Sequence, residues 1–188
     1  NNYFVPYPTI ETDRLILRMV KKSDAYDLFE LCRRPETSMY SVWNPHKSIN
    51  DTKDLISFRL SQYRKGQCTF FVIEEKASGR VIGSCSYVTI DENYKSAEIG
   101  YSILSDLWNM GYATEAAAAL IGFAFDRIGV IRVYAKVLPP NTASVRVLEK
   151  LGFQYEGTLK KAYYFEGKVS DINLFAITDD MYYQGRNL

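Results

Sequence analysis

Histidine and cysteine are scarce in this sequence. Its 188 residues include one histidine, His46, and three cysteines, Cys32, Cys68 and Cys85, which lie far apart. A zinc site needs clustered Cys and His ligands, and a disulfide framework needs cysteines that can pair. We therefore expect no metal centre, and we interpret the cysteines as small buried apolar residues.

An excess of charge of one sign is also missing. Lys and Arg number 23 against 22 Asp and Glu, which gives a formal net charge of +1. Nucleic-acid-binding surfaces are usually strongly basic, so we expect no nucleic acid partner. We interpret His46 and the short basic pairs Arg33-Arg34 and Lys160-Lys161 as solvated surface groups.

Long apolar runs are absent. No run approaches the roughly 20 residues of a membrane-spanning helix, and the segment from Asn1 to Pro6 has neither the basic nor the apolar region of a signal peptide. We expect a cytoplasmic protein that acts without a membrane. The 11 glycines never form G-x-G, and no G-x-x-x-x-G-K-[ST] occurs, which excludes the dinucleotide fingerprint and the phosphate loop of nucleotide hydrolases.

Strand-like and helix-like periodicities alternate along the chain. We expect strands at residues 14–18, 69–73, 81–88, 97–104, 131–137, 155–165 and 169–177. We expect helices from a Ser23 cap to before Pro35, from a cap at Ser48–Asp51 to Gly66, from Thr114 to a Gly129 stop, and from Asn141 to a Gly152-Phe153 stop with Ala143, Val147 and Leu151 inward. A loop spans Met39–Asn44. The strand–helix–strand order around residues 97–137 predicts a parallel pair in an α/β fold with a mixed sheet, in one domain at 9–180 with extensions at 1–8 and 181–188.

One segment is compatible with a phosphate ligand. Residues 107–115 leave a strand and enter a helix, where unpaired N–H groups and the helix dipole favour an anion. Gly111 would let the backbone and the anion approach closely. Taken alone, Gly111 favours a tight strand-to-helix turn without a ligand, and the surrounding motifs shift the interpretation toward a ligand site.

Several separated motifs carry a family resemblance. The spacing Trp108-x-x-Gly111-x-Ala113 follows Ala97–Tyr101 (AEIGY) and precedes Asn141-x-x-Ser144 and Glu149–Phe153 (EKLGF). Together they resemble the GNAT N-acetyltransferase superfamily, and Glu11–Arg18 (ETDRLILR) is similar to the branch that contains the ribosomal-protein alanine N-acetyltransferases. The resemblance covers residues 9–180. It implies a mostly antiparallel twisted sheet whose central parallel strands splay apart to hold acetyl-CoA, with helices on both faces.

The resemblance also implies how acetyl-CoA, as co-substrate, would be bound. The main chain of Ile103 and Leu104 would bond the pantetheine, and Asn141 would bond the pantetheine arm. The diphosphate would be held by the main-chain amides of Asn109, Met110, Gly111, Tyr112, Ala113 and Thr114. The family's loop usually begins with Gln or Arg, so Trp108 in that position removes one side-chain donor.

Acyl transfer to an amine needs a proton acceptor and a proton donor. The resemblance offers Glu98 as a base acting through water, an N–H near Ile103 for the oxyanion, and the Ser144 hydroxyl as donor to the sulfur and as a cofactor contact. Many members carry a tyrosine acid where this chain has Leu148. Ser144 equally fits a helix cap, and Glu98 equally fits a salt bridge. No Cys or Ser has a clear base beside it, so we expect direct attack in a ternary complex.

The acceptor amine is open. Tyr40, Trp43 and Tyr163 are candidate walls of an acceptor pocket, although isolated aromatic residues often belong to a core. An α-amino group has a pKa near 7.7–8.0 against about 10.4 for lysine, so a site with one base suits a protein N-terminal alanine. The alternatives are a small amine such as a polyamine or an antibiotic, for which Asp51 and Asp54 provide acidic side chains, and a non-catalytic acyl-CoA-binding module. Monomer and homodimer both stay open.

Overall fold

The computed structural model describes residues 2–40 and 43–186. Ser41 and Val42 of the predicted loop at Met39–Asn44 lie outside the described residues, as do positions 1, 187 and 188 of the predicted extensions. The chain divides into two compact units, one of residues 1–86 with 101–119 and one of residues 87–100 with 120–188. Each unit is described by itself.

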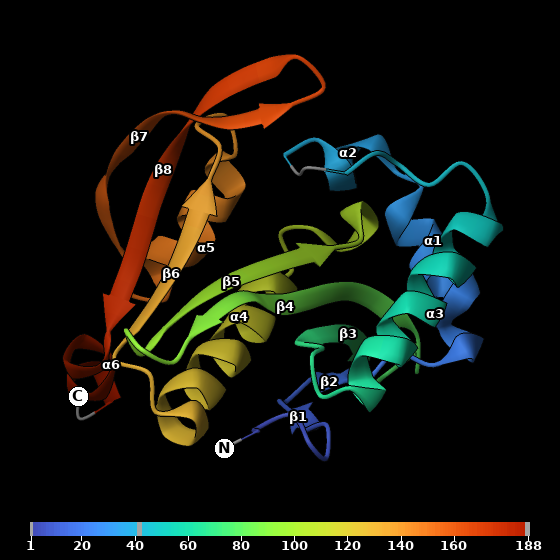
Figure 1. The fold of residues 1–188 in the computed structure, drawn as a ribbon, viewed down its shortest axis with the longest axis horizontal. Coiled ribbons are helices and arrows are strands. Elements are labelled where there is room, and N and C mark those ends of the chain that lie inside the picture. Colours follow the sequence, from blue (N-terminus) through green and yellow to red (C-terminus); the bar gives the residue numbers. More distant parts are fainter. Residues whose placement is uncertain (1, 41–42, 187–188) are drawn as a thin grey trace. The chain divides into compact units, whose positions relative to one another are not determined.

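The first unit contains an antiparallel set of strands in the order β1-β2-β3-β4 (Figure 1). These strands are β1 (Ile10–Glu11), β2 (Leu15–Arg18), β3 (Phe70–Glu75) and the first part of β4 (Val81–Asp91). Leu15 and Leu17 are fully buried and alternate with half-buried residues, as a strand with one covered face requires. The strands predicted at residues 14–18, 69–73 and 81–88 are confirmed.

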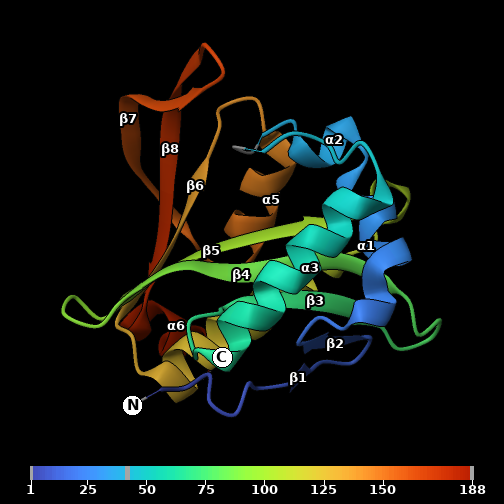
Figure 2. The same ribbon diagram turned by 45° about the vertical axis from the view of Figure 1, so that its right-hand side comes forward.

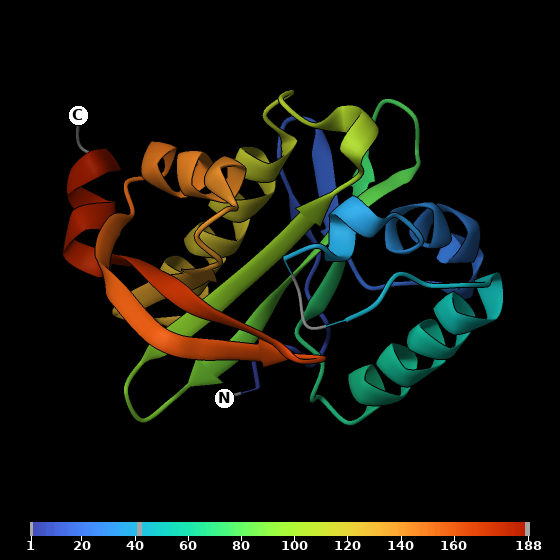
Figure 3. The same ribbon diagram turned by 90° about the horizontal axis from the view of Figure 1, so that it is seen from above.

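Helices α1 (Ala25–Cys32) and α3 (Ile49–Arg64) lie side by side in the first unit (Figures 2 and 3). Ser48 and Asp51 form the predicted capping box of α3. The predicted Ser23 cap of α1 is wrong by one residue, because Lys22–Asp24 form a short 3₁₀ turn (η1) and Asp24 is the N-cap. Pro35 does more than follow α1, because it begins the short helix α2 (Pro35–Ser38), where a missing N–H costs nothing.

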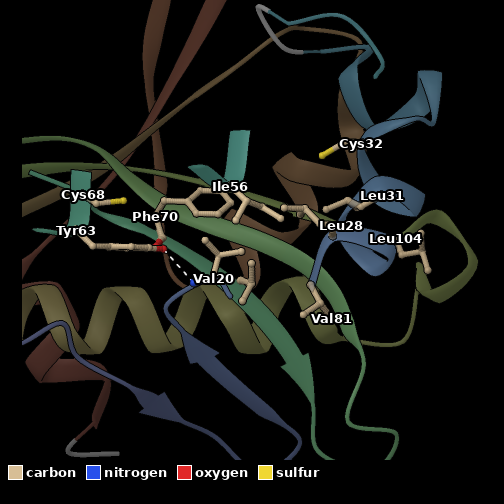
Figure 4. Packing of buried hydrophobic residues seen from close by; sticks show 12 residues of the cluster. Val20, Leu28, Leu31, Cys32, Ile56, Tyr63, Cys68, Phe70, Val81 and Leu104 are labelled. Atoms are coloured by element: carbon tan, nitrogen blue, oxygen red, sulfur yellow. Dashed lines mark hydrogen bonds between the residues drawn. The ribbon is translucent and has the colours of Figure 1, made fainter. Parts of the chain in front are cut away.

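The hydrophobic core of the first unit lies between these helices and the strands (Figure 4). Most of its buried members come from α1, α3, β3 and β4, among them Leu28, Ile56, Phe70 and Val81, and the segments between these elements add Val20, Cys68 and Leu104. The Tyr63 hydroxyl donates to Phe70 O at 2.7 Å and accepts from Val20 N–H at 3.2 Å, so its polar end is satisfied inside the core.

The second unit contains strands in the order β5-β6-β8-β7, of which β6, β8 and β7 lie side by side in Figures 1 and 2. They are β5 (Ser96–Ile103, of which this unit holds residues 96–100), β6 (Arg132–Val137), β8 (Lys168–Thr178) and β7 (Gln154–Phe165). Only β5–β6 is parallel; β6–β8 and β8–β7 are antiparallel. The predicted parallel pair is confirmed, and so is the α/β class with a mostly antiparallel sheet.

Helices flank these strands. Helix α4 (Tyr112–Phe123) continues through a π-helical turn at Ala124–Ile128 (η3) to Gly129. Gly129 has the left-handed conformation predicted for a stop, with φ +76°. None of the helices in the described part of the chain combines the length and apolarity needed to cross a bilayer.

Helix α5 (Thr142–Lys150) ends in the predicted Schellman stop, with Phe153 N–H bonded to Leu148 O and Gly152 N–H to Glu149 O. Its predicted inward face is wrong in part, since Val147 and Leu151 are only half-buried. Leu148 is fully buried whereas Ala143 is exposed, because the helix is rotated by about one position from the face that the apolar pattern indicated. Helix α6 (Asp179–Arg186) was not predicted, and its Tyr182 stacks on Phe125 with ring centroids 4.7 Å apart.

The β7–β8 hairpin turns at Glu166-Gly167 as predicted, with both residues at positive φ. It bends along its length (Figure 2), in agreement with the register shift between Leu159 and Tyr163 and the positive φ of Lys161.

Candidate active site

The turn into α4 has the geometry of an anion-binding helix start. Gly111 is exposed, has a φ of +81° and accepts the first helical hydrogen bond, from Glu115 N–H at 3.0 Å. The amides of residues 112–114 therefore precede the first intrahelical bond and have no acceptor within the helix. Asn109 is also left-handed, with a φ of +62°. The helix begins at Tyr112, two residues before the predicted Thr114, so more of the 109–114 segment belongs to the first helical turn.

The end of β5 lies close to the start of β4. A Cβ on Gly83 would collide with the carbonyl oxygen of Ser102, so only glycine permits this approach. Leu104 N–H donates to Ile82 O at 2.8 Å, which extends the contact past the end of the strand. Gly83 thus fixes the position of the Ile103 and Leu104 backbone relative to the start of β4.

The backbone groups predicted to bond pantetheine already have partners. Ile103 O accepts from the Trp108 indole Nε1 at 2.7 Å, and Leu104 O accepts from Leu107 N–H at 2.9 Å. A carbonyl oxygen has two lone pairs and can accept a second hydrogen bond, whereas the Leu104 N–H already donates to Ile82 O. A hydrogen bond between the Leu104 backbone and pantetheine would therefore use the Leu104 carbonyl oxygen.

Arg34 holds the short turn η2 (Ser105–Leu107) that leads into the 109–114 segment. Its Nη1 donates to Ser105 Oγ and to Asp106 Oδ1, each at 2.8 Å, and Ser105 Oγ donates to Glu36 at 2.7 Å. The bond from Arg34 lowers the pKa of Asp106. The interpretation of Arg34 as a solvated surface group is wrong, since its side chain is 22% exposed and bonded to Ser105 and Asp106.

The two aromatic candidates of the first unit are half-buried. Trp43 packs against the hydrophobic core, and its ring lies edge-on to His46 at 6.1 Å between centroids. His46 is not a solvated loop residue: its Nδ1 shares a 2.8 Å hydrogen bond with the buried Thr52 hydroxyl, and burial lowers its pKa. Trp43 therefore serves the core at least in part, and the acceptor role of Trp43 and Tyr40 stays a prediction.

Glu98 is buried in the second unit. It is 9% exposed and lies opposite Tyr134 in the parallel β5–β6 register. Lys136 Nζ is 3.7 Å from its carboxylate. Burial raises the pKa of Tyr134, and the nearby charge of Glu98 raises it further. The salt bridge weighed for Glu98 is present, and the role as a base stays a prediction.

Asn141 and Ser144 meet at the start of α5. Asn141 Oδ1 accepts from Ser144 N–H at 3.3 Å, so the N-cap interpretation of this pair is confirmed. The NH₂ end of the Asn141 side chain can still donate. Tyr163 lies on β7 opposite Ser170 and is half-buried. The proposed roles of these residues toward cofactor and acceptor stay predictions.

The cysteines do not provide an active nucleophile. All three are buried, and burial raises the pKa of Cys32 to about 12 and that of Cys85 as well. Thiols with a raised pKa are protonated near neutral pH and react poorly. Within residues 2–40 and 43–186, no group of three His, Cys, Asp or Glu residues is arranged to hold a metal ion.

The sequence interpretation missed the partners of the 109–114 segment. Arg14, Glu75 and Arg34 contact the segment or the turn before it from distant parts of the chain. Arg14 lies within the quoted ETDRLILR motif, but no local pattern couples it to a residue 96 positions away. A coupling of this kind becomes visible only in the folded chain.

Comparisons with known proteins identify the family of this chain. The family model described as "Acetyltransferase (GNAT) domain" matches residues 14–154. The chain is 34% identical over 169 residues to p20, an uncharacterized N-acetyltransferase of Bacillus licheniformis, with 90% of this chain and 95% of that protein covered. It is 24% identical to the [ribosomal protein uS5]-alanine N-acetyltransferase of Escherichia coli, covering 97% and 96%. A spermidine N(1)-acetyltransferase of Vibrio cholerae is 22% identical, covering 90% and 95%.

Solved structures share the fold. An acetyltransferase of the GNAT family from Bacillus anthracis aligns with a TM-score of 0.82 at 24% identity, covering 92% of this chain and 99% of that one. RimL, a ribosomal L7/L12 alpha-N-protein acetyltransferase in complex with coenzyme A, aligns with a TM-score of 0.80 at 23% identity, covering 93% and 99%.

Proposed function

The chain belongs to the GNAT acetyltransferase family, and from that premise we propose that it moves the acetyl group of acetyl-CoA to the α-amino group of a protein that begins with alanine. Membership of the family makes the protein an acetyl-CoA-dependent N-acetyltransferase. The acceptor and the roles of individual residues are the proposal.

The exposed turn at Gly111 carries the proposal. Its left-handed backbone leads into a helix of 12 residues whose first amides have no intrahelical acceptor, and the dipole of the helix adds positive potential there. In our proposal the amides of the 109–114 segment bind the diphosphate of acetyl-CoA. The carbonyl oxygens of Ile103 and Leu104 and the NH₂ group of Asn141 bond the pantetheine.

The chemistry needs no covalent enzyme intermediate. The neutral amine attacks the thioester carbonyl, the oxyanion is bound by an N–H near Ile103, and collapse of the tetrahedral intermediate breaks the C–S bond. The amine proton passes through water to Glu98, and the Ser144 hydroxyl donates a hydrogen bond to the departing thiolate. The proton held by Glu98 then passes through solvent to the thiolate, which leaves as the free thiol and returns Glu98 to its starting form. Lys136 Nζ lies 3.7 Å from the Glu98 carboxylate and is its ion-pair partner.

The choice of acceptor is supported by chemistry and by similarity. An α-amino group, with a pKa of about 7.7–8.0, reaches its neutral form near physiological pH with little help from a base, whereas lysine at about 10.4 does not. A relative of 24% identity over nearly the whole chain is named a [ribosomal protein uS5]-alanine N-acetyltransferase.

A small polyamine is the second candidate, since another relative is a spermidine acetyltransferase. Of the two acidic side chains considered for binding a polyamine, Asp51 and Asp54, Asp51 already has hydrogen-bond partners. Asp51 accepts from the backbone N–H groups of Lys47 and Ser48 as the cap of α3, which accounts for its carboxylate without a substrate.

The test measures release of free CoA thiol from acetyl-CoA with three acceptors. These are a peptide with a free N-terminal alanine and an internal lysine, the same peptide with its N-terminus blocked, and spermidine. We expect turnover with the free peptide alone. Turnover with spermidine but not with peptides would overturn the acceptor, and turnover of the blocked peptide would indicate a lysine acceptor. Thermal stabilisation by CoA without thiol release from any acceptor would indicate a binding module.

A further inference from the structure

Arg14 lies at the turn that joins β1 to β2. The turn is closed by Thr12 N–H donating to Leu15 O at 2.9 Å and by Leu15 N–H donating to the Thr12 hydroxyl at 3.0 Å. The Arg14 side chain therefore projects from a short, hydrogen-bonded hairpin tip. Its contacts lie on the 109–114 segment and the residue that follows it, all within the first unit.

The Arg14 guanidinium contacts three residues that lie before and after Gly111 in the chain. Nη1 donates to Met110 O at 2.9 Å, and Nε donates to Glu115 Oε1 at 2.8 Å. The guanidinium carbon lies 4.2 Å from the centroid of the Tyr112 ring. A Cβ added to Gly111 would lie 3.3 Å from Arg14 Nη2. One side chain thus contacts the residues before and after Gly111 and approaches Gly111 itself.

The partners of Arg14 are themselves held. Glu115 Oε2 accepts from the Thr12 hydroxyl at 2.5 Å and from the Arg14 backbone N–H at 2.9 Å. Burial acts to raise the pKa of Glu115, but the hydrogen bonds from Thr12 and Arg14 outweigh it and lower the pKa overall, so the carboxylate is ionised at neutral pH. The Tyr112 hydroxyl donates to Glu75, which anchors the ring beneath the guanidinium to β3.

The bond to Met110 O determines the direction of an amide. Met110 C=O and Gly111 N–H belong to one planar trans peptide, in which the C=O and N–H bonds point in opposite directions. Because Arg14 holds the oxygen on its own side, the Gly111 N–H points away from Arg14. A left-handed glycine is otherwise free to rotate this peptide at little cost.

We propose that Arg14 is a positioning residue for the diphosphate of coenzyme A: by holding Met110 O, Tyr112 and Glu115 it orients the Gly111 amide toward the ligand before the ligand binds. The inference rests on the proposed diphosphate role of the 109–114 segment. Preorganisation of this kind lowers the cost of binding and leaves the chemical step unchanged.

The test compares acetyl-CoA with S-acetylpantetheine, which carries the thioester but no diphosphate. For Arg14→Ala and Arg14→Lys we expect the KM for acetyl-CoA and the calorimetric Kd for CoA to rise about tenfold, with kcat within about twofold. The value of kcat/KM for S-acetylpantetheine stays within about twofold of wild type, because that substrate makes no use of the oriented amide.

Arg186→Ala is the matched control. Arg186 bonds Asp126 at 3.0 Å and lies 4.8 Å from the Tyr182 ring centroid, so its removal deletes the same two kinds of contact away from the 109–114 segment. We expect this variant to keep the wild-type KM. If Arg14→Ala fails to fold, Tyr112→Leu removes the ring together with its hydrogen bond to Glu75 and raises the KM for acetyl-CoA by about two- to fivefold.

Each outcome decides a different point. Equal losses with acetyl-CoA and S-acetylpantetheine would overturn the positioning role and make Arg14 a structural residue. Wild-type affinity for CoA in both Arg14 variants would overturn it as well. Absence of CoA binding by the wild-type protein would instead overturn the proposed function, and the inference with it.

Discussion

The Trp108 indole nitrogen and the Ile103 carbonyl oxygen are joined by a 2.7 Å hydrogen bond. This bond closes the loop between the end of β5 and the 109–114 segment across five residues. Trp108 is 47% exposed, so the indole is held mainly by this one polar contact rather than by burial. We call this hydrogen bond the Trp108 brace, because it restrains the loop between Ile103 and Trp108.

Replacing the brace is expected to weaken cofactor binding. Trp108→Phe keeps an aromatic ring but removes the N–H, and the loss of a bond worth about 1 kcal/mol raises the KM for acetyl-CoA roughly fivefold. The acceptor KM stays unchanged. Steady-state kinetics with each substrate varied in turn measures both values. An unchanged KM for acetyl-CoA would show that the Trp108–Ile103 bond does not contribute to cofactor binding.

A methyl group at Gly111 acts on the same turn. Gly111→Ala strains a backbone with a φ of +81° and brings a Cβ to 3.3 Å from Arg14, so we expect a loss of about 1 kcal/mol of stability, a melting temperature about 2–4 °C lower, and a weaker Kd for CoA. Gly129→Ala is the control, since Gly129 has a φ of +76° and open space around its Cβ position. The two variants should melt alike, and only Gly111→Ala should bind CoA less tightly in calorimetry.

Removing the carboxylate of Glu98 tests its role as a base. Glu98→Gln keeps the shape of the side chain but removes the proton acceptor, and we expect kcat to fall by about 10²-fold. Lys136→Ala removes the 3.7 Å ion-pair partner but no proton acceptor, so its effect on kcat should be small by comparison. A Glu98→Gln enzyme with wild-type kcat would assign the carboxylate to the salt bridge alone.

A second prediction about charge concerns stability. The Arg18 guanidinium forms two 2.9 Å bonds with Asp24 and one 3.0 Å bond with Glu74, and the side chains of Arg18 and Asp24 are only 12% and 8% exposed. Asp24→Asn leaves a buried cation with half its partners, which costs about 3 kcal/mol. We expect the melting temperature to fall by roughly 6–12 °C.

The exposed pair Lys160–Asp171 is the control for that measurement. The Lys160 side chain is 80% exposed, and Lys160→Ala should change the free energy of unfolding by less than about 1 kcal/mol. Similar melting temperatures for the Asp24 and Lys160 variants would contradict the importance of the buried cluster.

His46 predicts a pH dependence. Burial lowers its pKa in the folded chain, so the unfolded chain, with a pKa of about 6.5, binds the proton more readily. The stability that neutral His46 gives the folded chain is complete at pH values above about 6.5, the pKa of histidine in the unfolded chain. This stability is lost as the pH falls from about 6.5 toward the lower pKa of His46 in the folded chain. In His46→Asn, which keeps a polar group for Thr52, urea titrations between about pH 7 and 5 should lose this slope. A wild-type slope in the variant would assign the titration to other groups.

Local chemistry was sufficient to predict several elements. The Ser48–Asp51 box, the Asn141–Ser144 cap and the Gly152-Phe153 stop depend on residues within a few positions of one another, so their spacing is visible in the sequence. Helix α6 was missed because its Tyr182 has a partner, Phe125, that lies more than 50 positions earlier.

The inward face of α5 shows where periodicity is insufficient. Ala143, Val147 and Leu151 satisfy the helical spacing, but so does a face that contains Leu148, and only packing chose the latter. For the same reason Trp43 and His46 could not be assigned, since a loop residue becomes a core residue only through the segments that cover it.

The sequence by itself determined the family, the order of strands and helices, and the glycine turn that presents free amides at the start of α4, because each depends on short-range motifs and on backbone preferences of single residues. The tertiary structure decided which side chains hold that turn in place. Arg14 and Arg34 reach it from distant parts of the chain, and an ion pair between distant residues exists only once the intervening chain has folded to bring them within hydrogen-bonding distance.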